Sequence, residues 1–304
     1  MKNIFWILAL FASIRTFGQG FAGETYRVLI DPWGDAVEAS RDLLGTPQKR
    51  SQVIAGFAAL VIADPWLTSR WQQHIEPLQD PIRSAIHLPF YYQRTPLAPY
   101  LVNSDGLAFN WIVGGYIAGS VFKKPRVREV AVLCGKVAVE NFIVNHIILK
   151  TAFGRNRPLR PLNSYVTVEI PQPYVRDGYP YVNNPMDFFN DTRVSIYGTH
   201  LGTAMPSFHS SLYFGFAAVL DETLLPWYVA YPLALFPFAY DLRDHNHWVS
   251  DMVVAGVIGT ALGKAAAHRY DRRKARMTAL RSRGSKINSI WYPAPLGVGF
   301  RATW

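Results

Sequence analysis

The sequence predicts an all-α fold, on three observations. Apolar residues recur at helical spacings over several long stretches, and strand-like alternation is confined to the end of the chain. The 304 residues are 50% hydrophobic, which is enough for a sizeable core in one large domain or two small ones. No internal repeat is visible, so we expect a helical bundle rather than a solenoid.

The first residues have the pattern of a secretory signal peptide. Lys2 precedes a mostly apolar segment at residues 4–14, and Thr16 and Gly18 supply small residues suited to cleavage. This segment is well short of the roughly 20 apolar residues that cross a bilayer, so an uncleaved anchor is the weaker interpretation. Residues 1–18 therefore predict an exported protein of a bacterial periplasm or cell envelope.

The next part of the chain alternates between irregular and helical patterns. Residues 19–50 mix Gly, Pro, Asp and Arg without a sustained period and are predicted to be irregular. A short helix is expected at residues 52–63, and beyond it Trp66 and Trp71 recur on one helical face, which predicts core anchors. Residues 88–105 contain three prolines and are expected to form a connection.

The later elements follow from the same periodicity. Residues 158–205 are rich in Pro, Tyr, Asn and Asp without an apolar period, which predicts an irregular lid or insert. Residues 287–304 alternate like a short strand or an extended tail. The remaining helices are expected at residues 106–122, 128–150, 207–222, 225–240 and 250–270.

Composition favours a soluble or peripherally membrane-attached protein over one with several spans. The longest charge-free stretches, residues 106–122 and 223–240, are short or broken by proline. Residues 129–149 carry polar side chains typical of a helix with one solvent-facing side. The net charge of +10 comes partly from a basic run at residues 269–286, for which a solvated surface is the simpler interpretation than an anionic partner. No groove-reading motif accompanies it, so a nucleic-acid partner is not expected. Cys134, the single cysteine, is predicted to pack in the core.

Three short segments carry the chemistry. In "KTAFGRNRP", Lys150 ends a helix and Arg157 follows after a break at Gly154, so two cations can converge on one anion. In "AMPSFHSS", a helix beginning at Ser207 would direct its first N–H groups at an anion, with His209 at the rim, although a plain N-cap is the simpler interpretation.

The third segment, "HNHWVSD", places His247 and Asp251 four residues apart. On a helix they share a face, so the carboxylate can accept the Nδ1 proton and leave Nε2 basic. Such an imidazole can attack phosphorus, because the carboxylate stabilises the charge that develops on the ring. His245 with His247 could instead be a metal-ligand pair, but no Asp, Glu or Cys cluster accompanies them, so no metal and no cofactor are expected.

Together, the three segments resemble the type 2 phosphatidic acid phosphatases, which are similar in fold and site to nonspecific acid phosphatases and vanadium haloperoxidases. The family pattern is Lys-x6-Arg-Pro, then Pro-Ser-Gly-His, then Ser-Arg-x5-His-x3-Asp. The matching residues here are Lys150, Arg157 and Pro158; Pro206, Ser207 and His209; and His247 and Asp251. The resemblance covers roughly residues 100–270 and implies about six core helices. It leaves residues 19–99 as an N-terminal helical extension and residues 271–304 as a basic segment and tail.

The resemblance also implies roles for the residues of the site. Phosphate oxygens would be held by Lys150, Arg157, Ser207 and the backbone at Phe208. His209 would protonate the leaving group, and His247, oriented by Asp251, would be the nucleophile. Implied substrates are lipid phosphates such as phosphatidic acid, phosphatidylglycerol phosphate or an isoprenyl pyrophosphate.

Two positions depart from the family pattern. Phe208 stands where glycine is usual, which narrows the approach to the anion, and Tyr240 and Asp241 occupy the expected serine and arginine positions. A carboxylate there would repel phosphate, so Arg243 is the expected substitute. Aromatic residues in the irregular segment suit a lid over an acyl or prenyl chain, although packing is their commoner role; they include Tyr174, Tyr179, Tyr181, Phe188 and Phe189.

The sequence leaves three other functions open. Phe208 favours a lipid head-group phosphotransferase on the same fold. Asp241 favours a catalytically impaired binding protein. A vanadate-dependent peroxidase is the weakest alternative, since no residue indicates halide chemistry.

Overall fold

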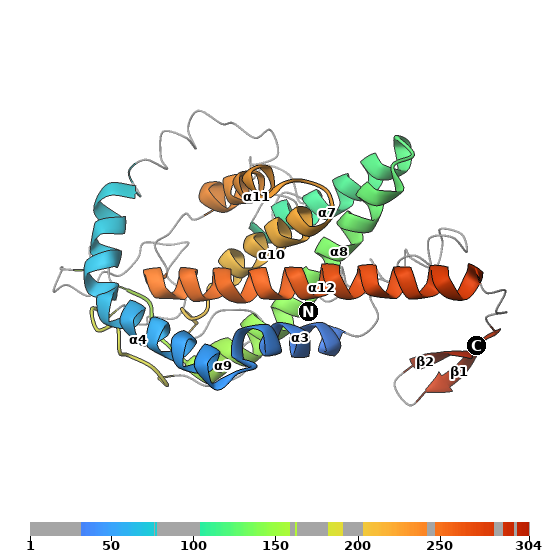
Figure 1. The fold of residues 1–304 in the computed structure, drawn as a ribbon. Helices are drawn as coiled ribbons and strands as arrows, with labels where there is room; N and C mark the ends of the chain where they lie inside the picture. The colour runs from blue at the N-terminus through green and yellow to red at the C-terminus, as the bar shows by residue number, and fades with distance from the viewer. Residues whose placement is uncertain are drawn as a thin grey trace. The chain divides into compact units, whose positions relative to one another are not determined.

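The computed structural model of the chain consists mostly of helices, which confirms the predicted mostly helical class (Figure 1). It divides into two compact units, Met1–Ala267 and His268–Trp304. The predicted signal peptide, Arg243 and His245 lie outside the described residues. The structure describes residues 32–75, 77, 104–158, 162, 182–190, 203–241, 247–282, 288–294 and 297–303.

Two helices occupy a stretch that the sequence predicted to be irregular. Helix α3 is Pro32–Leu44 and helix α4 is Pro47–Arg70. Proline in a first turn lacks only an N–H that would be unsatisfied anyway, and Thr46 caps α4 by accepting from the Lys49 N–H at 3.2 Å. The prediction is wrong because these prolines begin helices instead of interrupting them.

Helix α4 is longer at both ends than the short helix expected at residues 52–63. It passes through Pro65 and leads into the π-helix η1 (Trp71–Ile75), so residues 47–75 form one long helix. Trp66, predicted to anchor the core, is 63% exposed, whereas Trp71 is half-buried. The buried face of α4 instead carries Val61, Asp64 and Thr68.

The first lysine of the site lies near the end of a second long helix. After α7 (Ser104–Val121), the segments α8 (Pro125–Asn141), η2 (Phe142–Leu149) and α9 (Lys150–Phe153) follow one another without interruption. Gly154 ends the helix in the left-handed conformation, with φ 49°, and its N–H bonds to the Lys150 carbonyl at 2.9 Å. Glycine adopts this conformation without steric cost, so the predicted helix break at Gly154 is confirmed.

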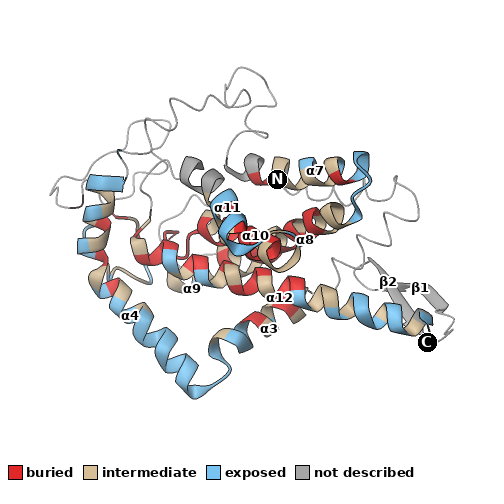
Figure 2. Ribbon diagram, turned by 45° about the horizontal axis from the view of Figure 1, so that its top comes forward, coloured by how far each residue is buried: buried red, intermediate tan, exposed pale blue. Residues whose placement is uncertain are grey.

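The centre of the first unit is built around α10 (Phe208–Thr223), which packs against α8 and α11 (Trp227–Asp241). Helix α12 (Val249–Ser282) extends past its predicted end at residue 270. A Cβ at Gly259 of α12 would lie 2.0 Å from the Ser211 carbonyl oxygen of α10, so only glycine permits this approach. Buried residues concentrate in α8, α10 and the first part of α12, and Cys134 is among them as predicted (Figure 2).

The second unit contains the C-terminal part of α12 and a β-hairpin. Strands β1 (Asn288–Ala294) and β2 (Gly297–Thr303) pair antiparallel, with Asn288 opposite Thr303. The short strand expected near the chain end is therefore present, as one half of a hairpin.

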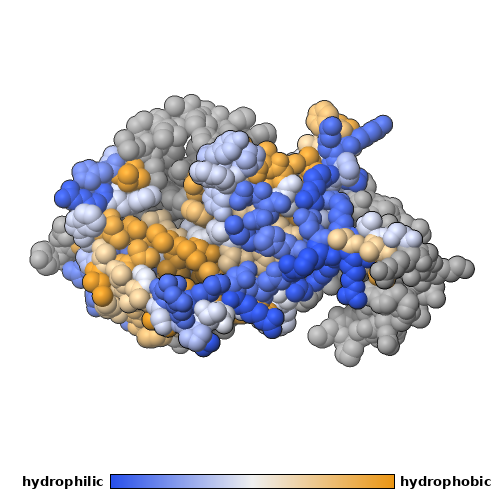
Figure 3. All heavy atoms as spheres, viewed as in Figure 1, coloured by the Kyte–Doolittle hydropathy of each residue, from blue (hydrophilic) through white to orange (hydrophobic). Residues whose placement is uncertain are grey.

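Within the part of the chain that the structure describes, three helices are long and apolar enough to cross a membrane: Pro47–Ile75, Pro125–Phe153 and Val249–Leu280. The second of them contains residues 129–149, whose polar side chains favoured a water-soluble bundle in the sequence. Exposed apolar side chains lie along α4, namely Val53, Ile54, Ile62 and Trp66. Apolar surface is visible over this part of the molecule in Figure 3, and the length and composition of these helices fit membrane association.

Candidate functional site

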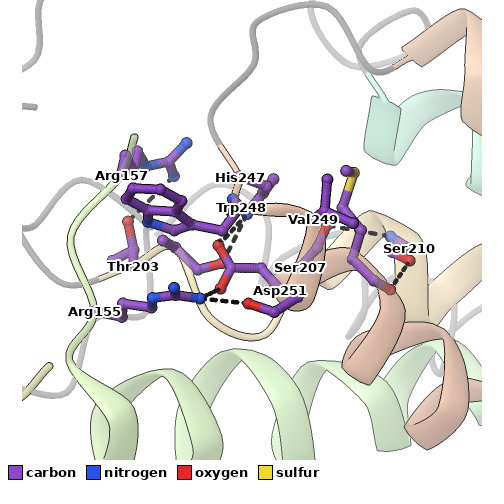
Figure 4. Close-up of polar contacts among 12 residues, drawn as sticks. Arg155, Arg157, Thr203, Ser207, Ser210, His247, Trp248, Val249 and Asp251 are labelled. Carbon is purple, nitrogen blue, oxygen red and sulfur yellow. Dashed lines mark hydrogen bonds and ion pairs between the residues drawn. The ribbon is translucent and has the colours of Figure 1, made fainter. Parts of the chain in front are cut away.

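Three segments that are distant in sequence are tied together by backbone hydrogen bonds. The Ala204 N–H donates to the Arg155 carbonyl at 3.0 Å, and the Ser207 N–H donates to the Asp251 carbonyl at 3.2 Å. Residues 150–158, 203–211 and 247–252 therefore lie against one another (Figure 4). These are the segments that the sequence predicted to form one site.

His247 is oriented by a backbone carbonyl. Its Nδ1 lies 2.7 Å from the carbonyl oxygen of Ala204. Because a carbonyl only accepts hydrogen bonds, Nδ1 carries the proton and Nε2 keeps its lone pair. The expected hydrogen bond from His247 to Asp251 is not formed, since Nδ1 lies 3.8 Å from Asp251 Oδ2.

Asp251 is held by other partners. Its Oδ2 accepts from the Trp248 N–H at 2.8 Å, and its Oδ1 accepts from the Arg155 guanidinium at 2.6 Å. The carboxylate thus caps the start of α12 and remains close enough to His247 to act on it electrostatically. Trp248 is fully buried and donates from its indole N–H to the Asn156 carbonyl at 3.0 Å, which fixes the residue beside His247.

The pKa of His247 is lowered to about 4. Burial is the main cause because it disfavours the charged ring, and the positive charges of Arg157 and Lys150 add to it; Asp251 acts in the opposite direction. His247 is therefore neutral at pH 7 and available as a nucleophile or base.

The two predicted phosphate-binding cations are both near this imidazole, as their effect on its pKa requires. Lys150 is buried in the last turn of the second long helix. Arg157 donates to the Thr203 hydroxyl at 3.2 Å, and its carbonyl accepts from the Val182 N–H at 3.0 Å. Arg157 is therefore linked to two separate segments of the chain.

Ser207 is the N-cap of α10. Its hydroxyl accepts from the Ser210 N–H at 3.4 Å, and its own N–H donates to the backbone carbonyl of Asp251. The simpler of the two predicted roles for Ser207 is therefore present. An anion cradle at this helix would use the N–H groups of Phe208 and His209 in the first turn.

The side chain of Phe208 belongs to an aromatic group that includes two residues of η2. Its ring lies 6.3 Å from that of Phe142, 5.8 Å from that of His146 and 5.3 Å from that of His209, each in an edge-to-face arrangement. His209 is half-buried in the first turn of α10. His146 is half-buried as well.

The aromatic residues assigned to a lid are described only in part. The Phe188 ring centroid lies 4.8 Å from the Arg155 guanidinium carbon and 6.3 Å from the Phe57 ring centroid. Phe188 therefore packs against Arg155 and α4. Phe189 is 72% exposed. Tyr174, Tyr179 and Tyr181 lie outside the described residues. Asp241 ends α11, and its side chain is not described.

Sequence reasoning missed the residues that hold the site together, chiefly Arg155 and Asp64. Arg155 is fully buried between Gly154 and Arg157, and Asp64 is a single carboxylate in an apolar helix. A lone charge in an apolar helix indicates a buried partner, and that signal could have identified Asp64.

No protein-family model matches the chain, and neither the curated proteins nor the solved structures compared with it include a match. Among the described residues, no three His, Cys, Asp or Glu side chains are grouped so that they could hold a metal ion.

Proposed function

We propose that the protein is a metal-independent phosphatase that hydrolyses lipid phosphates or pyrophosphates through a phosphohistidine on His247. The observation that carries the proposal is a neutral His247, with its Nδ1 proton on the Ala204 carbonyl, beside the cations Lys150 and Arg157. A lone pair on Nε2 next to two positive charges suits attack on a phosphate whose oxygens those charges bind. The resemblance to type 2 phosphatidic acid phosphatases supports the same reaction.

In the first step, the lone pair of His247 Nε2 forms a bond to phosphorus. The bond between phosphorus and the ester oxygen breaks, its electron pair stays on that oxygen, and His209 gives the oxygen a proton. In the second step, water attacks phosphorus and gives a proton to His209. The nitrogen–phosphorus bond then breaks, the electron pair returns to Nε2, and inorganic phosphate leaves.

The surroundings of α4 support a lipid substrate. One face of this helix meets the site through Asp64 and Thr68, while Ile62 and Trp66 are exposed on the other. A membrane lipid whose head group is in the site would therefore have its chains near an apolar surface. Phosphatidic acid, phosphatidylglycerol phosphate and isoprenyl pyrophosphate are the substrates to compare.

The decisive experiment is phosphate release from p-nitrophenyl phosphate and from these lipids by the purified full chain. We expect turnover without added metal, and loss by a factor of about 10³ or more in His247→Ala. His74→Ala changes an exposed histidine of η1 and is the matched control, with activity expected to stay within about twofold. Full activity in His247→Ala would refute the proposal.

The alternatives are separated by the same assay. Phosphate transfer to an added acceptor alcohol, with no free phosphate, would identify a phosphotransferase, the function that Phe208 favours. Lipid binding without turnover would identify the impaired homologue that Asp241 favours, and peroxidase activity after vanadate loading would identify the peroxidase.

Export is part of the proposal and rests on residues 1–18. We expect the mature protein in the cell-envelope fraction to begin after residue 18. N-terminal sequencing of that fraction tests this, and an intact Met1 would refute cleavage at that position.

A further inference from the structure

The buried support behind the site consists of one guanidinium and two carboxylates. Arg155, Asp64 and Asp251 are all fully buried. Arg155 Nη1 donates to Asp251 at 2.6 Å and to the Ser250 hydroxyl at 2.7 Å, and Nη2 donates to Asp64 at 2.7 Å. The Nε and Nη2 groups donate to the Pro185 carbonyl at 3.0 and 2.7 Å. All five N–H donors of the guanidinium are thus used.

Asp64 accepts from N–H and O–H donors only, as an ionised carboxylate does. Its Oδ1 accepts from the Ser250 N–H at 2.9 Å, and its Oδ2 accepts from Arg155 and from the Ser250 hydroxyl. Burial raises the pKa of Asp64 above its ordinary value, and the hydrogen bonds from Ser250 and Arg155 oppose that rise. The donors around the carboxylate therefore favour its charged form against the effect of burial.

Helix α4 also caps the first turn of α12. Asp64 does so through the Ser250 N–H, and Thr68 accepts from the Val249 N–H at 3.2 Å. Helix α4 thereby holds the start of α12 directly behind His247.

The charges of this group do not cancel. Without Asp64, the charge of Arg155 would neutralise that of Asp251. Asp251 would then stabilise a positive charge on His247 only weakly. With Asp64 present, two carboxylates share one guanidinium and the group keeps one net negative charge in a buried environment, where charges act strongly. Asp251 Oδ2, which lies 3.8 Å from His247 Nδ1, carries part of that charge.

We propose that Asp64 is a positioning residue for the nucleophile. By sharing Arg155 with Asp251 it preserves the negative charge that stabilises His247 as its ring becomes positive on phosphorylation. This proposal rests on the phosphatase function proposed above. It makes α4, which lies in the predicted N-terminal extension, a part of the site.

The test is Asp64→Asn, which keeps the shape of the side chain and removes its charge. We expect kcat to fall by about tenfold or more, the effect of one charge at an effective dielectric constant of about 20, with KM within about twofold. Inhibition by vanadate, which takes up the five-coordinate geometry of phosphoryl transfer, should weaken by the same factor as kcat. Inhibition by inorganic phosphate should not change.

Thr68→Val is the matched control, because it removes a cap from the start of α12 without changing any charge. We expect a lower Tm, with a loss of kcat and of vanadate inhibition well below that of Asp64→Asn, because no charge is removed. Asp64→Ser, which is smaller and leaves room for water, replaces Asp64→Asn if that variant does not fold.

The outcomes separate the two proposals. If His247→Ala is inactive and the Asp64 variant keeps wild-type kcat and vanadate inhibition, the role of Asp64 is overturned and the phosphatase stands. If kcat falls only in proportion to the folded fraction, with vanadate inhibition unchanged, Asp64 is structural and the inference is also overturned. If His247→Ala stays active, the proposed function fails first.

Discussion

Helices α4 and α10 both meet the site, but their buried faces are opposite in character. Ten residues of α10 are buried, and beyond the serines of its first turn they are all apolar or aromatic. The buried residues of α4 are Val61, Asp64 and Thr68, while Ile54, Ile62 and Trp66 are exposed. The buried face of α10 is polar only in its first turn and apolar beyond it. The buried face of α4 carries polar residues, and its exposed face is apolar.

This difference shows that the two helices are held by different forces. Burial of apolar area holds α10 in the core. Helix α4 has the bonds of Asp64 and Thr68 to Arg155 and the start of α12, in addition to the contacts of the Phe57 ring with Phe153 and Phe188. The exposed apolar residues of α4 suit contact with lipid, because burying apolar surface in a membrane is favourable and leaving it in water is not.

Truncation of one aromatic residue on each helix should give the largest contrast. Phe216 of α10 is fully buried and its ring lies 6.5 Å from that of Trp111, so Phe216→Ala should cost about 3–5 kcal/mol of unfolding free energy. Trp66→Ala on α4 should cost less than about 0.5 kcal/mol. Chemical denaturation in detergent measures both, and equal losses would remove the distinction between the helices.

A second contrast comes from glycine. Gly259→Ala would place Cβ 2.0 Å from the Ser211 carbonyl of α10 and should cost about 1–3 kcal/mol or more, because the backbones must separate. A Cβ on Gly56 of α4 would meet no atom of the described residues within 4 Å, so Gly56→Ala should stabilise by about 0.5–1 kcal/mol. Both are measured by thermal unfolding. A destabilising Gly56→Ala would show that α4 is covered.

The outward face of α4 should matter for membranes and not for chemistry. Replacing Ile62 and Trp66 with Asn should weaken flotation with phosphatidylglycerol vesicles by about tenfold or more, since each apolar side chain buried in lipid contributes about 1.5–3 kcal/mol. Turnover of p-nitrophenyl phosphate should stay within about twofold. Ser51→Asn, on the exposed part of the same helix, is the control, and equal flotation of the two variants would contradict a lipid-facing α4.

The smallest expected change is in the ionisation of His247 between pH 7 and about 5. With a pKa of about 4, the ring should stay as the neutral Nδ1–H tautomer from pH 7 to about 5, and its nitrogen NMR signals should not move. The unfolded chain binds a proton near pH 6.5 and the folded chain does not, so stability should decrease as pH falls from about 6.5 to 4. Protonation of the ring near pH 6.5 would show that burial and the two cations do not act on it as the structure requires.

Sequence reasoning reached most helices and all three site segments, because both depend on local spacing. Gly154 ended the second long helix and Ser207 began α10 as their residue types require. It failed where local signals are ambiguous: Pro32 and Pro47 begin helices, and Trp66 faces outward. A proline or a tryptophan does not by itself show which side of a helix the rest of the chain will cover.

The mostly helical class, the helix break at Gly154 and the N-cap at Ser207 were determined by the sequence alone, through periodicity and capping that act within a few residues. Only the tertiary structure decided the partners. His247 donates to Ala204 instead of Asp251, Asp251 pairs with Arg155, and Arg155 is shared with Asp64 from a helix more than 90 residues away in the chain. Buried charges must find partners wherever packing brings them, and no local pattern specifies which distant residue that will be.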